Sequence, residues 1–196
     1  MAIYKNFLDL DLSKQYSYAD YLLFEFNERV EILKGYIYAM SPAPSRKHQH
    51  ISANIFRVFD RLFFKKPCAV YFAPFDVRLK INENSEEITT VLQPDLCIIC
   101  DENKLDEKGC LGAPDLVVEI LSPGNTKKEM ELKFEIYEQS GVKEYWIVQP
   151  EYENVLLFEL SNGKYELKSH SSQDSNFITS TIFPDLHVSL EEIFRV

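Results

Sequence analysis

One glutamate and one lysine stand out because the sequence pattern places both on faces that should be buried. Glu119 interrupts the apolar run from Leu116 to Leu121, whose apolar side chains fall on both faces, as in a central strand. Lys133 follows fourteen residues later, on the stripe of an amphipathic helix that also carries Met130, Phe134 and Tyr137. A buried charge is costly unless it is paired, hydrogen-bonded or bound to a metal. The two side chains can therefore be expected to meet.

Taken alone, this pair has a simple structural explanation. It can form an ion pair without chemistry, or the lysine can reach past the sheet edge to water. A second acid, Asp95, follows Pro94 near the start of another apolar stretch, 91–100, which we predict to be a strand. Two carboxylates at neighbouring positions on adjacent strands can hold Mg²⁺. The metal would polarise a phosphate and activate a water, and a lysine would stabilise the developing charge. Such a set suits hydrolysis of phosphodiesters.

The segment 113–150 supplies the scaffold for Glu119 and Lys133. It reads as strand, turn, helix, turn and strand, the pattern of a βαβ unit that joins two parallel strands. Thr126 and Glu129 have the spacing of a capping box, and Gly141 is placed to end the helix. The unit therefore predicts that the lysine-bearing helix packs on the strand that carries the glutamate.

Two further side chains are open to either a structural or a functional interpretation. Glu31 lies in the first strand of a hairpin predicted for 29–40, which turns at Lys34-Gly35. It is either an exposed cross-strand charge or an inward acid of a site. His48 lies at the start of a helix predicted for 46–64. A core or capping histidine is the commoner case, but this helix start is also the most basic part of the chain and could favour phosphate.

Length, charge and composition limit the class of protein. The 196 residues, with 25 Phe and Tyr but six Gly, predict one ordered domain over residues 1–196. The net charge of −10 argues against broad electrostatic adhesion to nucleic acid or to an anionic membrane. It leaves room for a locally basic cleft, or for one whose carboxylates are neutralised by metal.

The cysteines and the N-terminus bear on location. The sequence lacks an apolar run of membrane-spanning length and the core of a signal peptide, so we expect a cytoplasmic protein. We accordingly expect the four cysteines, at 68, 97, 100 and 110, to be reduced. Cys97 and Cys100 have the spacing of a zinc knuckle, but they lie three apart on a predicted strand and should point to opposite faces.

The remaining pattern predicts further strands and loops. Strands are expected at 70–80 and 91–100, and a hairpin at 154–168 turns at Asn162-Gly163. A short helix follows near the C-terminus. Loops are expected at 41–44, 82–87, 101–112 and 169–176.

At these residues the sequence resembles the putative restriction endonuclease (Uma-two) family of the PD-(D/E)xK nuclease superfamily. The resemblance extends from about Ser17 to Phe194. It is carried by VEILKGYIYAMSPAP, by the histidine in RKHQH, and by QPDLCII, PDLVVEILSP and KFEIYEQSGVKEYWIVQP. It implies an α/β fold of the restriction-endonuclease-like sandwich type, with a mixed central β-sheet flanked by helices. It also matches Asp95, Glu119, Glu31 and His48 to the family's acids and histidine.

Two departures from the family pattern bear on the site. The third position of the acidic tripeptide is Leu121 rather than lysine, so the resemblance makes Lys133 the migrated replacement. The family's Asp-Pro after the Tyr-Trp strand is Gln149-Pro150 here, which leaves no acid for a role at that position.

Two hypotheses follow. The first is an endonuclease that uses magnesium or manganese, acts on DNA as a homodimer, and holds its metal with Asp95 and Glu119. Its catalytic set would be completed by Lys133, Glu31 and His48. The second is a catalytically silent interaction module that retains the fold, with these charges as a satisfied polar core.

Overall fold

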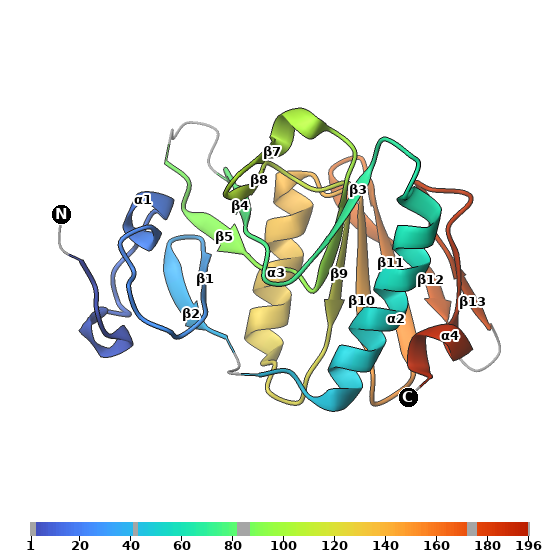
Figure 1. The fold of residues 1–196 in the computed structure, drawn as a ribbon, viewed down its shortest axis with the longest axis horizontal. Helices are drawn as coiled ribbons and strands as arrows, with labels where there is room; N and C mark the ends of the chain where they lie inside the picture. Colours follow the sequence, from blue (N-terminus) through green and yellow to red (C-terminus); the bar gives the residue numbers. More distant parts are fainter. Residues whose placement is uncertain (1–2, 41–42, 82–86, 172–175, 196) are drawn as a thin grey trace.

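The chain folds into the expected α/β structure, in which helices pack against mixed β-sheet (Figure 1). It has two large mixed sheets, of which only the central one was expected from the sequence. The computed structural model describes residues 3–40, 43–81, 87–171 and 176–195. Each large sheet has six strands and contains both parallel and antiparallel neighbours. A third, two-stranded sheet lies near the C-terminus.

The first six-stranded sheet, called here the central sheet, has the order β12-β11-β10-β9-β6-β3. Only β9 and β10 are parallel in it, as the predicted βαβ unit requires. Its strands are β3 (Ala69–Phe72), β6 (Leu96–Ile99), β9 (Leu116–Ile120), β10 (Glu144–Gln149), β11 (Asn154–Ser161) and β12 (Lys164–Ser171).

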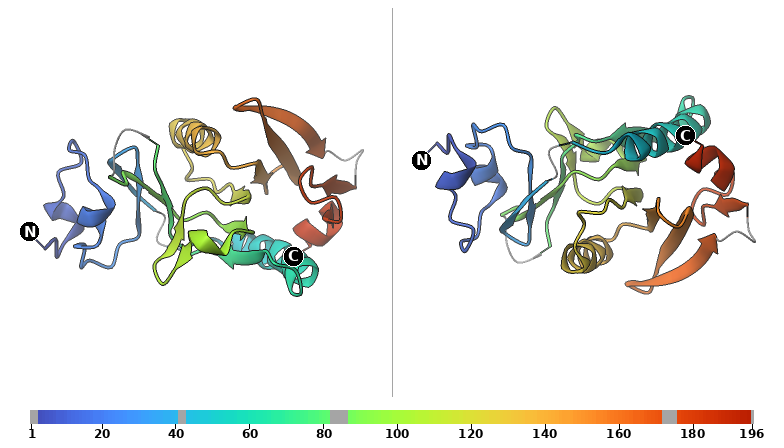
Figure 2. Two further views of the ribbon diagram at one scale, coloured as in Figure 1. Left: turned by 90° about the horizontal axis from the view of Figure 1, so that it is seen from above. Right: turned by 90° about the horizontal axis from the view of Figure 1, so that it is seen from below.

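Two helices cover opposite faces of the central sheet (Figure 2). The first, α2 (Arg46–Phe63), packs on the face formed by Leu96, Leu116 and Val118. The second, α3 (Lys127–Ser140), packs on the other face, where the intervening residues Cys97 and Val117 point. Because side chains alternate along a strand, β6 and β9 are buried on both faces, which explains their unbroken apolar sequences.

The second six-stranded sheet, called here the outer sheet, shares a core with α3 and the central sheet. Its order is β2-β1-β5-β4-β8-β7, and only β4 and β8 are parallel. Its strands are β1 (Val30–Leu33), β2 (Tyr36–Ala39), β4 (Val77–Leu79), β5 (Thr90–Leu92), β7 (Leu105–Asp106) and β8 (Gly109–Leu111).

Short elements complete the structure. The N-terminal segment packs aromatic side chains against β1, β2 and β5. The C-terminal segment packs against α2 and the central sheet. These elements are η1 (Phe7–Asp9), α1 (Tyr18–Tyr21), η2 (Glu102–Lys104), β13 (Phe177–Thr179), β14 (His187–Ser189) and α4 (Leu190–Phe194).

Local signals predicted several boundaries correctly. The helix expected at 46–64 ends at Phe63, and its first turn is capped by Ser45. Thr126 caps α3 by accepting a hydrogen bond from the Glu129 N–H, 3.1 Å away, and Gly141 ends the helix with a φ of 85°. The hairpin turns at 34–35 and 162–163 also form as expected, with positive φ at all four residues.

Two predicted strands are wrong in extent. The stretch 70–80 forms β3 and then β4, and the stretch 91–100 forms β5 and then β6, so each crosses between the two sheets. The crossings occur at Pro74 and Pro94, because proline has no N–H to continue a ladder. They run side by side, since the Ala73 N–H donates to the Asp95 carbonyl at 3.1 Å. This junction brings Asp95 to the place where the sheets meet.

Other expectations were incomplete or fall outside the described ranges. The loop predicted at 101–112 contains η2, β7 and β8, and the β13–β14 hairpin was not anticipated. Most of the loop predicted at 82–87, and parts of those at 41–44 and 169–176, fall on residues that the structure does not describe.

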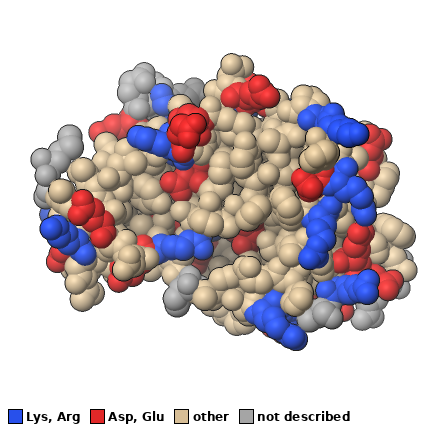
Figure 3. Space-filling view, in the orientation of Figure 1, with Lys and Arg blue, Asp and Glu red and all other residues tan. Residues whose placement is uncertain are grey.

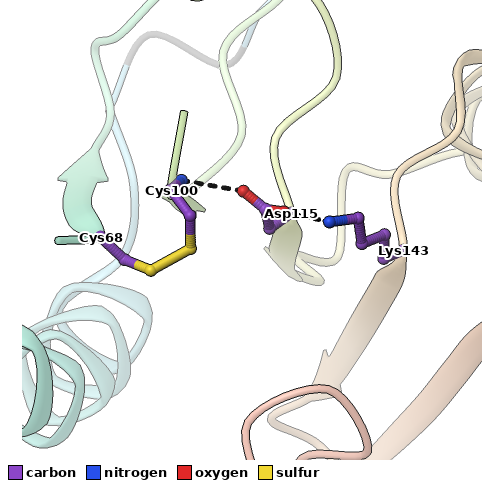
Figure 4. The surroundings of a disulfide bond; sticks show 4 residues. All are labelled: Cys68, Cys100, Asp115 and Lys143. Atoms are coloured by element: carbon purple, nitrogen blue, oxygen red, sulfur yellow. Dashed lines mark hydrogen bonds and ion pairs between the residues drawn. A yellow bond between two sulfur atoms is a disulfide. The ribbon is translucent and has the colours of Figure 1, made fainter. Parts of the chain in front are cut away.

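The expectation of four reduced cysteines is wrong for Cys68 and Cys100, which form a disulfide (Figure 4). The strand register explains the pairing: Ala69 lies opposite Ile99, so the next pair along the ladder is Cys68 and Cys100. The other two thiols, at 97 and 110, are free and buried. Cys97 and Cys100 do pack in different cores, which agrees with the prediction that they face opposite ways.

No helix in the described part of the chain has both the length and the apolar composition needed to span a bilayer. The expected cytoplasmic location remains a prediction.

Candidate active site

The five residues selected from the sequence line one cavity of about 450 Å³. They come from five different parts of the fold: β1, α2, the crossing before β6, β9 and α3. The C-terminal end of β9 and the N-terminal parts of α2 and α3 contribute to the lining of the cavity. In Figure 1 these three chain ends lie in the lower half of the picture. The residues are Glu31, His48, Asp95, Glu119 and Lys133.

The register of β6 and β9 brings Asp95 beside Glu119. Leu96 lies opposite Val118, and continuing the register by one residue places the two acids across from each other. The Ile120 N–H fixes this arrangement by donating to Asp95 Oδ2 at 2.7 Å. The two carboxylates therefore occupy neighbouring positions on adjacent chain segments, as expected from the sequence.

Lys133 joins two of the acids. Its Nζ lies 2.9 Å from Glu31 Oε2 and 3.2 Å from Glu119 Oε1. The lysine is only 7% exposed, so it does not reach past the sheet edge to water. Burial alone would lower the pKa of Lys133, but the charges of Glu119 and Glu31 outweigh burial and raise it. The site therefore holds an ammonium ion at its centre.

Glu31 is the inward acid rather than an exposed cross-strand charge. It is 2% exposed, and its Oε1 accepts a hydrogen bond from the Gln93 N–H at 2.9 Å. Because Gln93 lies on the crossing between the sheets, this bond ties β1 to the segment that carries Asp95. The outer sheet thus contributes directly to the cavity.

Tyr137 holds Glu119 and was seen in the sequence only as an apolar stripe residue. Its hydroxyl donates to Glu119 Oε1 at 2.7 Å. Burial raises the pKa of Glu119 to about 7; the Lys133 charge acts against this rise, and the Glu31 and Asp95 charges add to it. Tyr137 lies one helical turn after Lys133, and that spacing was the available signal that both could reach the same carboxylate.

His48 contacts the other acid from the opposite face of the sheet. Its Nε2 lies 3.3 Å from Asp95 Oδ1 and 3.1 Å from the Ile120 carbonyl oxygen. Since both neighbours are acceptors, Nε2 must carry the proton. Burial lowers the pKa of His48, but the hydrogen bond and charge of Asp95, with Ile120 and Glu119, outweigh burial and raise it. Among the described atoms, Nδ1 has no hydrogen-bond partner.

Comparison with known proteins places the chain in a family. A family model described as "Uma2: Putative restriction endonuclease" matches residues 17–191. The chain belongs to the Uma2 family. The solved structure of a protein described as a putative nuclease of DUF820, from Anabaena variabilis, superposes with a TM-score of 0.72 at 18% identity. That match covers 92% of this chain and 98% of the other. A search of curated proteins finds no match.

The Uma2 family and the shared fold indicate a nuclease. The two departures from the family pattern can now be located. Leu121, Gln149 and Pro150 line an adjoining cavity of about 300 Å³ and not the one that holds the acids, although both cavities are bordered by Ser122, Pro123 and Asn125. Lys133 brings an ammonium to Glu119 from α3, with Nζ 3.2 Å from Oε1. That Lys133 replaces the family's lysine stays a prediction.

The donor set determines what cation could bind. In the described part of the chain, no three His, Cys, Asp or Glu side chains are arranged to hold a metal by themselves. Four carboxylates nevertheless line the cavity, those of Glu31, Asp95, Glu119 and Glu129. Among the described side chains, the basic groups that contact the first three are Lys133 and His48. Magnesium suits such a site, because it commonly takes one or two carboxylates and completes its shell with water and substrate phosphate. The residues present fit this cation through Asp95 and Glu119.

Sequence reasoning also missed Arg29 and the side chain of Gln93, both of which line the same cavity. The guanidinium of Arg29 donates to Gln93 Oε1 through Nε, at 3.1 Å, and through Nη2. The signal for Gln93 was its position directly before Pro94-Asp95. Arg29 gave no signal, because it precedes β1 and carries no periodic pattern.

Proposed function

We propose that this protein is a metal-dependent endonuclease that hydrolyses phosphodiester bonds in DNA. Asp95 and Glu119 would bind Mg²⁺ or Mn²⁺, and Lys133, Glu31 and His48 would complete the catalytic set. The observation that carries this proposal is the position of Lys133 Nζ, within 3.3 Å of Glu31 and Glu119, in a cavity that Asp95 also lines. The family and the fold give independent support for a nuclease.

Each side chain has a task in this proposal. A bound divalent cation supplies Lewis acidity toward a phosphate oxygen and lowers the pKa of a bound water. Lys133 presents its ammonium to the charge that develops on the phosphoryl oxygens. Glu31 holds Lys133 in place, and Tyr137 and His48 orient Glu119 and Asp95 respectively. These contacts fix the side chains of the site before substrate binds. Groups that are already in place can stabilise the charge of the transition state without having to reorganise during the reaction.

A basic helix beside the cavity supports a nucleic-acid substrate. Basic side chains gather along α2, with acids between them (Figure 3). The helix carries one acid, Asp60, against four basic residues apart from its histidines: Arg46, Lys47, Arg57 and Arg61. The N-terminal end of α2, where His48 lies, borders the cavity. A backbone that follows α2 would meet the acids there, despite the chain's net charge of −10.

The decisive experiment is plasmid cleavage by the purified protein with magnesium or manganese. We expect nicking that EDTA abolishes and that falls strongly in Asp95→Asn and Glu119→Gln. Glu135→Gln is a matched control, since Glu135 lies on α3 but its side chain is 59% exposed. If the wild-type protein has no metal-dependent cleavage, the endonuclease proposal fails.

The alternative is a catalytically silent module that keeps the fold. The pairing of Lys133 with both Glu31 and Glu119 favours it, since these charges are largely satisfied without a metal. Calorimetric titration separates the two. Heat of binding with magnesium or manganese supports the nuclease, and its absence at millimolar metal supports the module.

We also propose that the protein acts as a homodimer. Cutting both strands of a duplex is served by two-fold symmetry, and C2 dimers are the commonest soluble oligomers. Light scattering over a wide concentration range tests this, and a constant monomer mass would remove the proposal.

A further inference from the structure

The guanidinium of Arg29 is held in one direction by a buried amide. Its Nε and Nη2 both donate to Gln93 Oε1, and Gln93 is only 9% exposed. Gln93 is itself fixed on two other sides. Its backbone N–H donates to Glu31 Oε1 at 2.9 Å, and its Nε2 donates to Asp76 Oδ1 at 2.8 Å. The amide therefore cannot turn without breaking these bonds.

Arg29 differs from the other cations of the cavity in its partners. Lys133 contacts two carboxylates, and His48 contacts Asp95. Within the described ranges, Arg29 forms no ion pair, and its guanidinium bonds only to a neutral oxygen. Burial raises the pKa of the Asp76 carboxyl and the charge of Arg29 acts against this rise, but the guanidinium contacts no carboxylate directly in the described ranges. The charge of Lys133, by contrast, is shared between Glu31 and Glu119 in direct contact.

The geometry leaves donors for such a ligand. A guanidinium has five N–H groups, and two of them are used by Gln93, so three remain. Those on the Nη atoms form the fork that matches two oxygens of a phosphate. Arg29 lines the cavity together with Asp95, Glu119 and Lys133. An anionic substrate that approaches these carboxylates needs a cation to hold it.

We propose that Arg29 binds a phosphate of the substrate backbone, and that Gln93 positions its guanidinium for this contact. This inference rests on the proposed function, because it assigns the phosphate contact within the same site. The phosphate is part of the DNA backbone, so the contact should not depend on base sequence.

The salt dependence of DNA binding tests this contact directly. Binding of a short fluorescent oligodeoxynucleotide is measured by anisotropy, with calcium replacing magnesium and the DNA checked on a gel for intactness. In Arg29→Met we expect about tenfold weaker binding, equal across sequences, and a slope of log affinity against log salt that is smaller by about 0.7–0.9. Arg29→Lys should keep the slope but bind a few-fold more weakly, because lysine lacks the fork.

Control variants separate this role from a structural one. Lys164→Met removes a 79%-exposed lysine that lies on β12 and does not line the cavity, so it should leave affinity and salt slope at wild-type values. Gln93→Leu keeps the charge of Arg29 but removes the oxygen that accepts its hydrogen bonds. The slope of log affinity against log salt should therefore persist while the affinity for DNA falls. Thermal midpoints of all variants are recorded in the same buffers.

The outcomes distinguish the two proposals. If wild type binds and cleaves DNA but Arg29→Met keeps the wild-type affinity and salt slope, the phosphate role of Arg29 is wrong and the nuclease proposal stands. If Arg29→Met loses affinity only together with its thermal midpoint, and Arg29→Lys does the same, Arg29 is a structural bridge to Asp76. If wild type neither binds nor cleaves DNA, the proposed function fails, and this inference fails with it.

Discussion

Lys133 Nζ lies 2.9 Å from Glu31 Oε2, and this contact connects α3 with a strand of the outer sheet. The two residues are 102 positions apart in the sequence. Both side chains are at least nine-tenths buried, so water cannot replace either partner. The same ammonium contacts Glu119 on the central sheet. Lys133 therefore links the two sheets through the candidate site, so a single substitution would disturb both this link and the proposed catalytic role.

Lys133→Met should destabilise the protein as well as inactivate it. The change leaves Glu31 and Glu119 buried without their cation, at a cost of about 3–5 kcal/mol of unfolding free energy. Adding Glu31→Gln removes one stranded charge and should restore part of the stability. Cleavage should remain about two to three orders of magnitude below wild type in the double variant. Chemical denaturation and plasmid nicking measure both effects. A double variant with wild-type nicking would remove Lys133 from the mechanism.

Divalent metal should raise the thermal midpoint of the wild-type protein. A ligand that binds only the folded state adds about 2.7 kcal/mol at a hundred times its dissociation constant. Glu119→Gln should abolish most of this rise, because it removes one of the two proposed ligands. The exposed Glu135→Gln should retain the rise. Differential scanning fluorimetry with and without magnesium makes the comparison, and equal shifts in wild type and Glu119→Gln would rule out Glu119 as a ligand.

Stability without metal should fall as pH rises between about 4.5 and 7. The pKa of Glu119 is raised from 4.5 to about 7 in the folded chain, so the folded state keeps a proton that the unfolded state has released. The stabilising contribution of Glu119 is therefore complete below pH 4.5 and is lost as the pH rises through 7. The raised pKa of His48 acts in the same direction above pH 6.5. Thermal midpoints are measured in EDTA across this pH range, and subtracting the midpoint of Glu119→Gln from that of wild type isolates the effect of Glu119. A difference that grows as pH rises would contradict the prediction.

The sequence indicated which residues line the candidate site, but it did not indicate how they are arranged in space. Glu119 and Lys133 were visible because a charge on an apolar strand or stripe breaks a short-range pattern. Glu31 remained ambiguous, since a hairpin residue can face either way until the segment that packs against it is known. That segment contains Gln93, whose N–H binds Glu31 only because the chain crosses between sheets at Pro94. The crossing depends on long-range packing, and the apolar pattern of 91–100 continues through it unchanged.

The disulfide shows a similar limit. The expectation of reduced thiols came from an expected location, whereas pairing depends on register. Cys68 meets Cys100 because β3 and β6 are antiparallel neighbours, and neighbour relations between strands are not contained in local pattern. The βαβ unit was predictable, by contrast, because β9, α3 and β10 follow one another in sequence and pack on each other.

Thiol titration should find two reactive cysteines in the unfolded, non-reduced protein and four after reduction. In the folded protein, Cys97 and Cys110 should react slowly, since both are buried and burial raises the pKa of Cys110 to about 11. Loss of the disulfide should lower stability by about 3–4 kcal/mol, as expected for a closed loop with a separation of 32 residues. Four reactive thiols in the unfolded protein without reductant would contradict the disulfide.

Glu144→Gln should lower stability while leaving the response to metal intact. Glu144 is fully buried on β10, but it differs from Glu119 in its partners. Its Oε1 accepts from Trp146 Nε1, and its Oε2 accepts from the backbone N–H groups of Thr181 and Ile182 and from two hydroxyls.

A glutamine at this position has only one acceptor oxygen, so its NH₂ group must face either the indole N–H or the backbone donors. At least one buried donor then loses its acceptor, at a cost of about 1–3 kcal/mol. Glu144 does not line the metal cavity, so magnesium should still raise the thermal midpoint of the variant by the wild-type amount. Scanning fluorimetry of Glu144→Gln beside Glu119→Gln therefore separates a structural buried acid from a metal-binding one. If Glu144→Gln also lost the shift, the metal response would depend on the integrity of the whole sheet and not on Glu119 alone.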